Sequence, residues 1–465
     1  MRREKGVKHS QMDILSGSIV DKLILFALPL AFTGMLQQLF NAADVAVVGN
    51  YVGKEAMAAV GSNSAIIGLL VNGFVGLALG ANVVISTYIG QKRPDRIHNC
   101  VHTSVLFSLI GGVCITAVGE IVAPILIDSL SVPSNVYPMA LAYLRIYLLG
   151  MPVIFLYNFE AAIFRSQGDT KTPLVCLIIS GVLNVGLNLL FVRIFGMNAD
   201  GVALATVISN LASSVLLFVL LVRRSDAIKI KFSDIRVHKT ELIPMIKIGL
   251  PAGLQSMVFS ISNICIQSAI NKLGSDVMAA SAAAFNIEIL AYYLLNSFGQ
   301  GCTTFVGQNY GAGNISRCRK VTRISLIIDV SVTTAVSLII LYFGKPLLGI
   351  FNSDSTIKDI GFIRLAFILS AEGINAVMEI MSGAMRGYGH SLSPALITFF
   401  GVCGIRIAWV YTIFKWSPKF ITLMLVYPIS WVATAIALVI AYILFMKHFL
   451  RTFIDSKIHL RKDQL

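Results

Sequence analysis

Six acidic residues lie within long apolar stretches of this 465-residue sequence, where an ionised side chain is costly. They are Asp44, Glu160, Glu288, Asp329, Glu372 and Glu379. A carboxylate that is kept from water can bind a hard cation through its oxygens, or it can hold a proton. Each of these acids is therefore a candidate functional group, and Asp44 has the most informative neighbours.

Two amides and one hydroxyl group can reach Asp44. Asn184 and Asn188 are four residues apart, so they face the same side of one helix. At a rise of about 1.5 Å per residue, Asp44 and both amides fall in the outer half of their spans, and Thr206 enters the next span from the outer side. These four residues predict a site for H⁺ or Na⁺. The alternative is hydrogen bonding between helices without any role in transport.

Pro29 removes a backbone hydrogen bond inside the first apolar stretch, so that helix should bend there. Two interpretations stay open. Pro29 is either a hinge that moves when Asp44 changes its protonation, or a static kink.

The second half of the chain carries its own charged candidates. Glu288 lies near the middle of an apolar stretch, and Glu379 lies two turns before Arg386. Arg406 could form an ion pair with either acid. A structural salt bridge and a counter-charge for a substrate are both compatible with this pattern.

The remaining acids are less informative. Glu160 and Asp329 lie near the predicted cytoplasmic ends of their helices, so we expect them to extend toward water. Glu372 lies deeper, and the sequence suggests no role for it.

The composition is that of a protein embedded in a membrane. Hydrophobic residues make up 56% of the chain and charged residues 13%, about half the charged fraction of a soluble domain. The net charge of +14 lies in loops and tails, which indicates membrane topology and anionic lipid rather than nucleic acid. The seven cysteines are scattered and have no metal-ligand spacing. No phosphate-binding, nucleophile or dinucleotide motif is present, so we expect no metal, no cofactor and no enzymatic activity.

Apolar stretches of about 20 residues recur along the whole chain and predict twelve transmembrane helices. The fold class is therefore an all-α polytopic membrane protein with two six-helix bundles. The predicted spans are 23–47, 57–80, 98–123, 138–162, 173–194, 201–222, 242–270, 278–303, 321–344, 359–384, 394–415 and 422–446. The corresponding domains are a tail (1–22), a first bundle (23–223), a linker (224–241), a second bundle (242–446) and a tail (447–465).

The distribution of basic residues predicts the orientation in the membrane. The tails and the even-numbered connections hold 26 of the 37 Lys and Arg residues. By the positive-inside rule, both termini and the linker are cytoplasmic.

The two halves resemble each other in sequence. The motif at Arg165 to Pro173 recurs at Arg386 to Pro394, about 221 positions later, and each copy ends one helix and begins another. Gly168 and Gly389 suit the left-handed position after a helix, and Thr172 and Ser393 suit an N-cap before proline. Six spans per half give parallel repeats, and transporters of this design place the substrate path between their halves.

The chain resembles the MATE family of multidrug and toxic compound extrusion transporters over about residues 14–450. The motifs that carry the resemblance are Leu28-Pro29, Leu39 to Asp44, Gly307 to Gly313, both Arg-Gly-Pro junctions, Asn184 with Asn188, and Gly201 to Thr206. The resemblance implies two six-helix bundles and a cavity open to one side. It also implies efflux of small organic, often cationic, compounds by antiport with H⁺ or Na⁺.

The resemblance also implies roles for individual residues. Asp44, Asn184 and Thr206 match the family's cation site, and Pro29 matches its bending proline. Where members often have a second aspartate this chain has Asn188, which weakens the case for Na⁺ and favours H⁺. Asn375 stands where one branch of the family has an aspartate on span ten. Residues expected at a substrate or second cation site in the second half are Glu288, Glu379, Gln255 and Asn375.

The resulting prediction is a monomeric secondary exporter in the bacterial inner membrane, in contact with lipid and small drug-like substrates. Two alternatives stay open. A lipid-linked oligosaccharide flippase of the wider superfamily predicts a large cationic cavity, and a receptor or scaffold predicts no flux.

Overall fold

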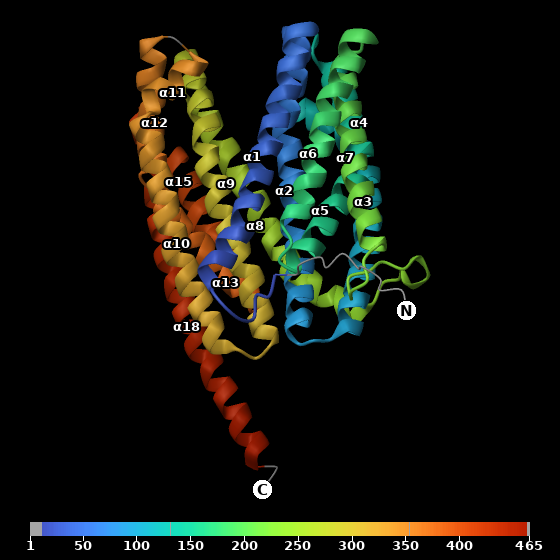
Figure 1. Cartoon of the computed structure of the whole chain (residues 1–465). Coiled ribbons are helices and arrows are strands. Elements are labelled where there is room, and N and C mark those ends of the chain that lie inside the picture. The colour runs from blue at the N-terminus through green and yellow to red at the C-terminus, as the bar shows by residue number, and fades with distance from the viewer. Residues whose placement is uncertain (1–11, 131, 353, 463–465) are drawn as a thin grey trace. The chain divides into compact units, whose positions relative to one another are not determined.

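The protein is helical over almost all of the chain that the structure describes (Figure 1). The computed structural model describes residues 12–130, 132–352 and 354–462. A chain that crosses a membrane must satisfy its backbone polar groups internally, and a helix does so within each segment. The helices of the first half are α1 (Ile19–Tyr51), α2 (Lys54–Gly90), α3 (Pro94–Ser129), α4 (Tyr137–Leu149), α5 (Met151–Ser166), α6 (Lys171–Asn188) with the π-helical turn η1 (Leu189–Ile194), and α7 (Ala199–Val222).

The second half repeats this plan with more interruptions. A linker that contains the short turn η2 (Phe232–Asp234) leads into it. Its helices are α8 (Lys239–Asn271), α9 (Ser275–Gly311), α10 (Ile315–Tyr342), α11 (Gly344–Phe351), α12 (Ser355–Leu369), α13 (Glu372–Gly387), α14 (Leu392–Thr398), the π-helical turn η3 (Phe399–Gly404), α15 (Ile405–Tyr411), α16 (Ile413–Trp416), α17 (Phe420–Met424) and α18 (Val426–Lys462).

These helices form a multi-pass membrane protein. Eleven helices in the described part are long and apolar enough to cross a bilayer, and a twelfth span results if α4 and α5 are counted together. The axis bends by 49° between α4 and α5. Pro152 lies in the first turn of α5 and cannot donate a backbone hydrogen bond, which explains the break. The sequence predicted one continuous span at 138–162.

The repeated junctions have the predicted glycine geometry but different helix starts. Gly168 and Gly389 have φ values of +86° and +81°, which confirms the left-handed position. The N-cap predictions are wrong, because α6 begins at Lys171 and α14 at Leu392, before Thr172 and Ser393. In the first junction Asp169 supplies the cap, since its Oδ1 accepts a hydrogen bond at 3.0 Å from the backbone N–H of Thr172.

The described residues reach into both predicted tails. In the C-terminal one, 447–462 continue α18, while 463–465 lie outside the described residues. Half of the predicted N-terminal tail, residues 1–11, also lies outside them. The first described residues lead directly into α1, and Ser18 caps that helix by accepting from the N–H of Asp21. Pro29 lies inside α1, which continues past it as one helix.

The described chain divides into two compact units. Unit 1 comprises the chain up to Ile246 together with Thr304–Val321, and unit 2 comprises Lys247–Thr303 together with Thr322 onward. The segment Thr304–Val321 belongs to the second half of the sequence, yet it packs with the first. A side-chain hydrogen bond also joins this segment to α2, because Thr304 Oγ1 donates to Asn82 Oδ1 at 3.0 Å.

Glycines bring this segment into direct backbone contact with α2. A Cβ atom on Gly90 would lie 1.9 Å from the carbonyl oxygen of Gln308. A Cβ atom on Gly311 would lie 2.0 Å from the carbonyl oxygen of Thr87. Backbone atoms cannot move aside as a flexible side chain can, so the two helices meet this closely only because both positions are glycine.

We expect Gly90→Ala to lower the free energy of unfolding by about 1–3 kcal/mol, as overpacking of a tight contact does. The midpoint of thermal unfolding of the detergent-purified protein measures this. Gly61→Ala in the same helix is the control, because a Cβ there meets nothing within 4 Å. Equal midpoints for the two variants would refute the close-contact interpretation.

Candidate cation-coupling site

The first predicted site forms where α1, α6 and α7 meet in unit 1. Asp44 is 4% exposed although it lies on a long apolar helix. Gly181 on α6 allows the approach, since a Cβ there would lie 1.8 Å from the ring of Phe40, one turn before Asp44. Asn188 is the last residue of α6 before the π-helical turn η1. Such turns are frequent at functional sites.

All four predicted residues come together in a closed ring of hydrogen bonds. Asn188 Nδ2 donates to Asp44 Oδ1 at 2.5 Å, and Thr206 Oγ1 donates to Asp44 Oδ2 at 3.0 Å. Asn188 Nδ2 also donates to Asn184 Oδ1 at 3.2 Å, and Asn184 Nδ2 donates to Thr206 Oγ1 at 3.4 Å. Asp44 is the one ionisable member, and its partners are neutral.

The hydroxyl of Thr206 allows this ring to accommodate two charge states of Asp44. Its single hydrogen has two acceptors at 3.0 Å, Asp44 Oδ2 and the carbonyl oxygen of Val202. When Asp44 is ionised, Thr206 donates to the carboxylate. When Asp44 is protonated, the carboxylic acid can donate to Thr206 Oγ1, and Thr206 can turn its hydrogen to Val202.

The oxygens of the ring also suit a small hard cation, although the ring contains one carboxylate and therefore one negative charge. Asn188 Oδ1 is buried and has no hydrogen-bond partner, so an acceptor next to Asp44 is unused. Within the described residues no group of three or more His, Cys, Asp or Glu side chains could hold a metal ion. The chemistry therefore fits a proton or a monovalent cation such as Na⁺.

Two tyrosines near this ring were not predicted. Tyr143 and Tyr147 on α4 are buried and lie within electrostatic range of Asp44. Their rings stack with centroids 6.3 Å apart. The sequence signal was their spacing of four residues in a predicted span, which places both on one helix face. They add two buried aromatic rings to the surroundings of the carboxylate.

The predicted acids of the second half do not form a comparable site. Glu288 is 7% exposed and makes a two-pronged ion pair with Arg364, with N–O distances of 2.6 and 3.1 Å. Glu379 Oε1 accepts from Arg386 Nη2 at 2.7 Å. The suggestion that Arg406 pairs with one of these acids is wrong, because nearer arginines on α12 and α13 take that role.

The other two predicted residues of this site have partners of their own. Gln255 Nε2 donates to Thr398 at 3.1 Å, and Asn375 Nδ2 donates to Glu372 at 3.0 Å. The four residues are thus held by four different partners. Their assignment to a substrate or second cation site remains a prediction.

Arg406 has a distinct environment inside unit 2. It is 2% exposed, and its guanidinium lies 4.3 Å from the ring centroid of Tyr427. Nη1 donates to Asn263 Oδ1 at 3.1 Å. A ring face and neutral acceptors stabilise this charge.

The prediction that Glu160 and Asp329 extend toward water is wrong. Both are fully buried at 0% exposure, and each accepts a hydrogen bond from one hydroxyl group. Snorkelling requires a free path to the interface, and helix packing closes that path for both side chains.

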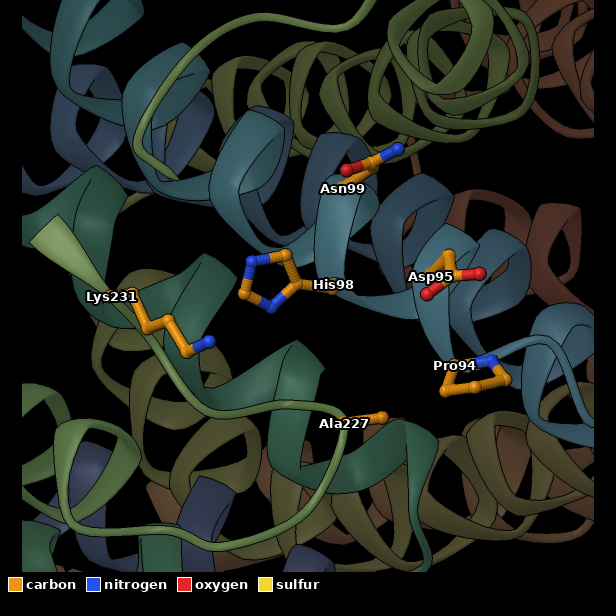
Figure 2. A pocket seen from close by; sticks show the side chains of 6 residues that line it. All are labelled: Pro94, Asp95, His98, Asn99, Ala227 and Lys231. Atoms are coloured by element: carbon orange, nitrogen blue, oxygen red, sulfur yellow. The ribbon is translucent and has the colours of Figure 1, made fainter. Parts of the chain in front are cut away.

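A surface pocket of about 300 Å³ lies elsewhere in unit 1, between the start of α3 and the linker after α7 (Figure 2). Its lining residues are Pro94, Asp95, His98, Asn99, Ala227 and Lys231. Next to it, the hydroxyl of Ser233 and the ring of His98 hold the pKa of Asp234 below its ordinary value. None of the predicted site residues lines this pocket.

Comparison with known proteins places this arrangement in a family. The MatE family model matches residues 29–190 and 251–412, one stretch in each half. The probable multidrug resistance protein YoeA of Bacillus subtilis is 27% identical over 397 residues, which cover 84% of this chain and 86% of that protein. The probable multidrug resistance protein NorM of Thermotoga maritima is 26% identical over 402 residues, which cover 85% of this chain and 86% of that protein.

Solved structures show the same fold. One is described as the outward-facing conformation of a multidrug resistance MATE family transporter of the MOP superfamily. It has a TM-score of 0.87 and 22% sequence identity, and it covers 95% of this chain and 99% of that one. At this identity the likeness establishes the fold.

A second carboxylate at position 188 should convert the ring into a stronger cation site. In Asn188→Asp, two carboxylates would lie within hydrogen-bond distance and would have to share a proton or a cation. We expect added Na⁺ to raise the thermal unfolding midpoint of this variant more than that of wild type, with choline at equal ionic strength as reference. The matched control is Asn210→Asp, which adds the same charge one helical turn after Thr206 on α7. An equal Na⁺ response in wild type and both variants would contradict the proposed geometry.

Glu288 should be tested as a structural partner of Arg364. Glu288→Gln leaves a buried guanidinium without its carboxylate and should cost about 3–5 kcal/mol of folding free energy. Replacing both residues with methionine should recover most of this loss, since a buried pair exchanged for apolar groups is often neutral. Thermal unfolding measures both. A double variant that is stable but does not export would instead assign the pair to the substrate path.

Proposed function

The chain belongs to the MatE family, and from this premise we propose that it exports small organic, often cationic, compounds from a bacterial cell by antiport with H⁺. Members of this family are transporters and not enzymes. The observation that carries the proposal is the buried ring around Asp44. It holds one ionisable group among neutral partners, and its hydrogen bonds can be satisfied with or without a proton on the carboxylate.

The choice of H⁺ over Na⁺ follows from the composition of the ring. A Na⁺ ion is held best where several charged oxygens replace its water. Here Asn188 takes the place of a second carboxylate and donates its amide N–H to Asp44 at 2.5 Å. A donor in that position stabilises the bare carboxylate and leaves less room for a metal ion. The proton is the better fit.

The proposed cycle assigns each residue a physical task. Asp44 takes up a proton from the outer side, which removes the charge that Asn188 and Thr206 stabilise. The ring then rearranges, with Thr206 turning toward Val202. Pro29 lies 15 residues before Asp44 on the same helix and leaves one backbone carbonyl of α1 without its usual partner. The structure is compatible with bending at this position as the carboxylate changes state.

The proposed substrates, small organic compounds, are supported by the names of the relatives and by the partners of the buried arginines. The two curated relatives are named as probable multidrug resistance proteins, and the chain matches most of their length. A lipid-linked oligosaccharide flippase would require a large cationic cavity. The buried arginines have partners instead: Arg364 is engaged by Glu288, and Arg406 by Tyr427 and Asn263. No observation in the described residues favours that alternative.

Asp44→Asn should abolish pH-driven export. Purified protein in liposomes that contain a fluorescent organic cation is exposed separately to a pH gradient and to a Na⁺ gradient. Wild type should transport under the pH gradient, and Asp44→Asn should fall to the rate of protein-free liposomes, because an amide cannot bind and release a proton at these pH values. Asp21→Asn, in the exposed first turn of the same helix, should transport like wild type.

Three results would change the proposal. Full pH-driven flux in Asp44→Asn would remove Asp44 from the coupling step. Flux driven by Na⁺ alone would replace H⁺ as the coupling ion. Translocation of a labelled lipid headgroup, without flux of the organic cation, would favour the flippase.

A further inference from the structure

A second acid of unit 1, Glu160 on α5, is buried without a counter-charge. Its side chain has 0% exposure. Oε2 accepts a hydrogen bond from Ser214 Oγ at 2.8 Å, while Oε1 is buried and has no hydrogen-bond partner. Among the described residues, no Lys, Arg or His side chain lies within salt-bridge distance of it. One hydroxyl group does not compensate a full charge inside an apolar bundle, so this carboxyl group is held in its neutral, protonated form.

The groups nearest to Glu160 are polar and uncharged, while the guanidinium of Arg165, five residues further along α5, lies within electrostatic range of Tyr157. Tyr157 of the same helix lies within electrostatic range, and its buried hydroxyl group also lacks a hydrogen-bond partner. Cys176 of α6 is the other titratable neighbour. Two unsatisfied polar groups at one buried place mark a position where a proton or a water molecule can be accepted.

The helices that cover the other side of α5 add no charge. Asn82 of α2 donates to the carbonyl oxygen of Ala162 at 3.3 Å, and Ser86 donates to that of Ser166 at 3.3 Å. Both side chains bind the α5 backbone. The side-chain partner of Glu160 itself is Ser214 of α7.

A line of polar side chains along the contact between α6 and α7 runs from Glu160 to the Asp44 ring. We call it the α6/α7 polar seam, and its members are Asn188, Asn184 and Ser180 of α6 with Thr206, Asn210, Ser213 and Ser214 of α7. At the Glu160 end of the seam, Ser213 Oγ donates to Ser180 Oγ across the two helices, and at the Asp44 end Asn184 Nδ2 donates to Thr206 Oγ1 at 3.4 Å. Asn210, between these two contacts, donates to the backbone carbonyl of Thr206 at 2.8 Å. From Thr206 to Ser214 the seam descends by about 12 Å, at the helical rise of about 1.5 Å per residue.

The chemistry of this seam suits proton movement. A hydroxyl group both donates and accepts a hydrogen bond, so it can take a proton on its oxygen as it releases another. Such hydroxyl groups also hold membrane helices together, so the feature that distinguishes this seam is the acid at each end. The seam has a carboxyl group at each end, Asp44 and Glu160.

We propose that Glu160 is a second proton-carrying carboxyl group of unit 1, which exchanges protons with Asp44 along the α6/α7 polar seam. The role in transport rests on the proposed H⁺ antiport. A proton leaves the carboxylic acid of Asp44, one proton shifts along the hydroxyl groups and water of the seam, and Glu160 binds it. The proton that Glu160 held before leaves toward the predicted cytoplasmic end. Glu160 is neutral before and after this step, and Asp44 returns to its ionised form.

The protonated state can be tested without any transport. Infrared difference spectroscopy compares Asp44→Asn with the double variant Asp44→Asn/Glu160→Gln. We expect the double variant to lose one carbonyl-stretch band of a protonated carboxylic acid, and that band should shift in heavy water. Ser214→Ala in the same background should move the band, because it removes the hydrogen bond at 2.8 Å. No difference between the spectra would overturn the assignment.

The role in coupling is tested by pH-driven flux in liposomes. Glu160→Gln should slow the flux by about a hundredfold, the lower range for loss of a proton-transferring side chain. Drug binding and the thermal unfolding midpoint should stay near wild type, and Glu160→Asp should restore part of the rate. The matched control is Asp329→Asn in unit 2, another fully buried acid with one hydroxyl donor, Thr333, which should leave the rate unchanged.

The outcomes separate this proposal from the proposed function. If wild type shows no pH-driven flux, H⁺ antiport fails, while the infrared comparison still decides whether Glu160 holds a proton. If wild type transports and Glu160→Gln transports equally fast, the relay is wrong. Equal losses in Glu160→Gln and Asp329→Asn would also refute it, since neutralising any buried acid would then be enough.

Discussion

The cost of placing an ionised group in an apolar bundle governs every site of this protein. Each buried acid must be neutralised by a proton, by a cation or by an arginine. Glu288 and Glu379 are paired with Arg364 and Arg386, and their charges are fixed by those partners. Asp44 and Glu160 have only neutral partners in unit 1. Their charge can change, and such a change is what coupling to an ion requires.

The repeated sequence therefore supports different chemistry in its two halves. Both halves have the junction with a left-handed glycine, at Gly168 and Gly389, and both contain six spans. The junction arginine recurs as Arg165 and Arg386, but the acids were not duplicated with these elements. The two halves thus share a helix arrangement, while ion binding depends on a few side chains at the helix contacts.

Close packing explains how the helices reach the distances that this chemistry needs. Gly181 admits the ring of Phe40 and brings α1 against α6, next to Asp44. Gly90 and Gly311 allow α2 and the end of α9 to meet backbone to backbone. In lipid no hydrophobic driving force holds helices together. Small residues stabilise the helix pairs instead, because they permit close van der Waals contact.

The sequence by itself determined the class of fold and the four residues around Asp44. Hydropathy and helical periodicity are local properties, and Asn184 and Asn188 share a helix face in any arrangement of the chain. Only the tertiary structure decided which arginine neutralises Glu288, that Glu160 is buried and not snorkelling, and that Ser214 donates to it. These are contacts between helices far apart in the sequence, and they depend on how each helix is rotated and packed, which residue spacing along one chain does not specify.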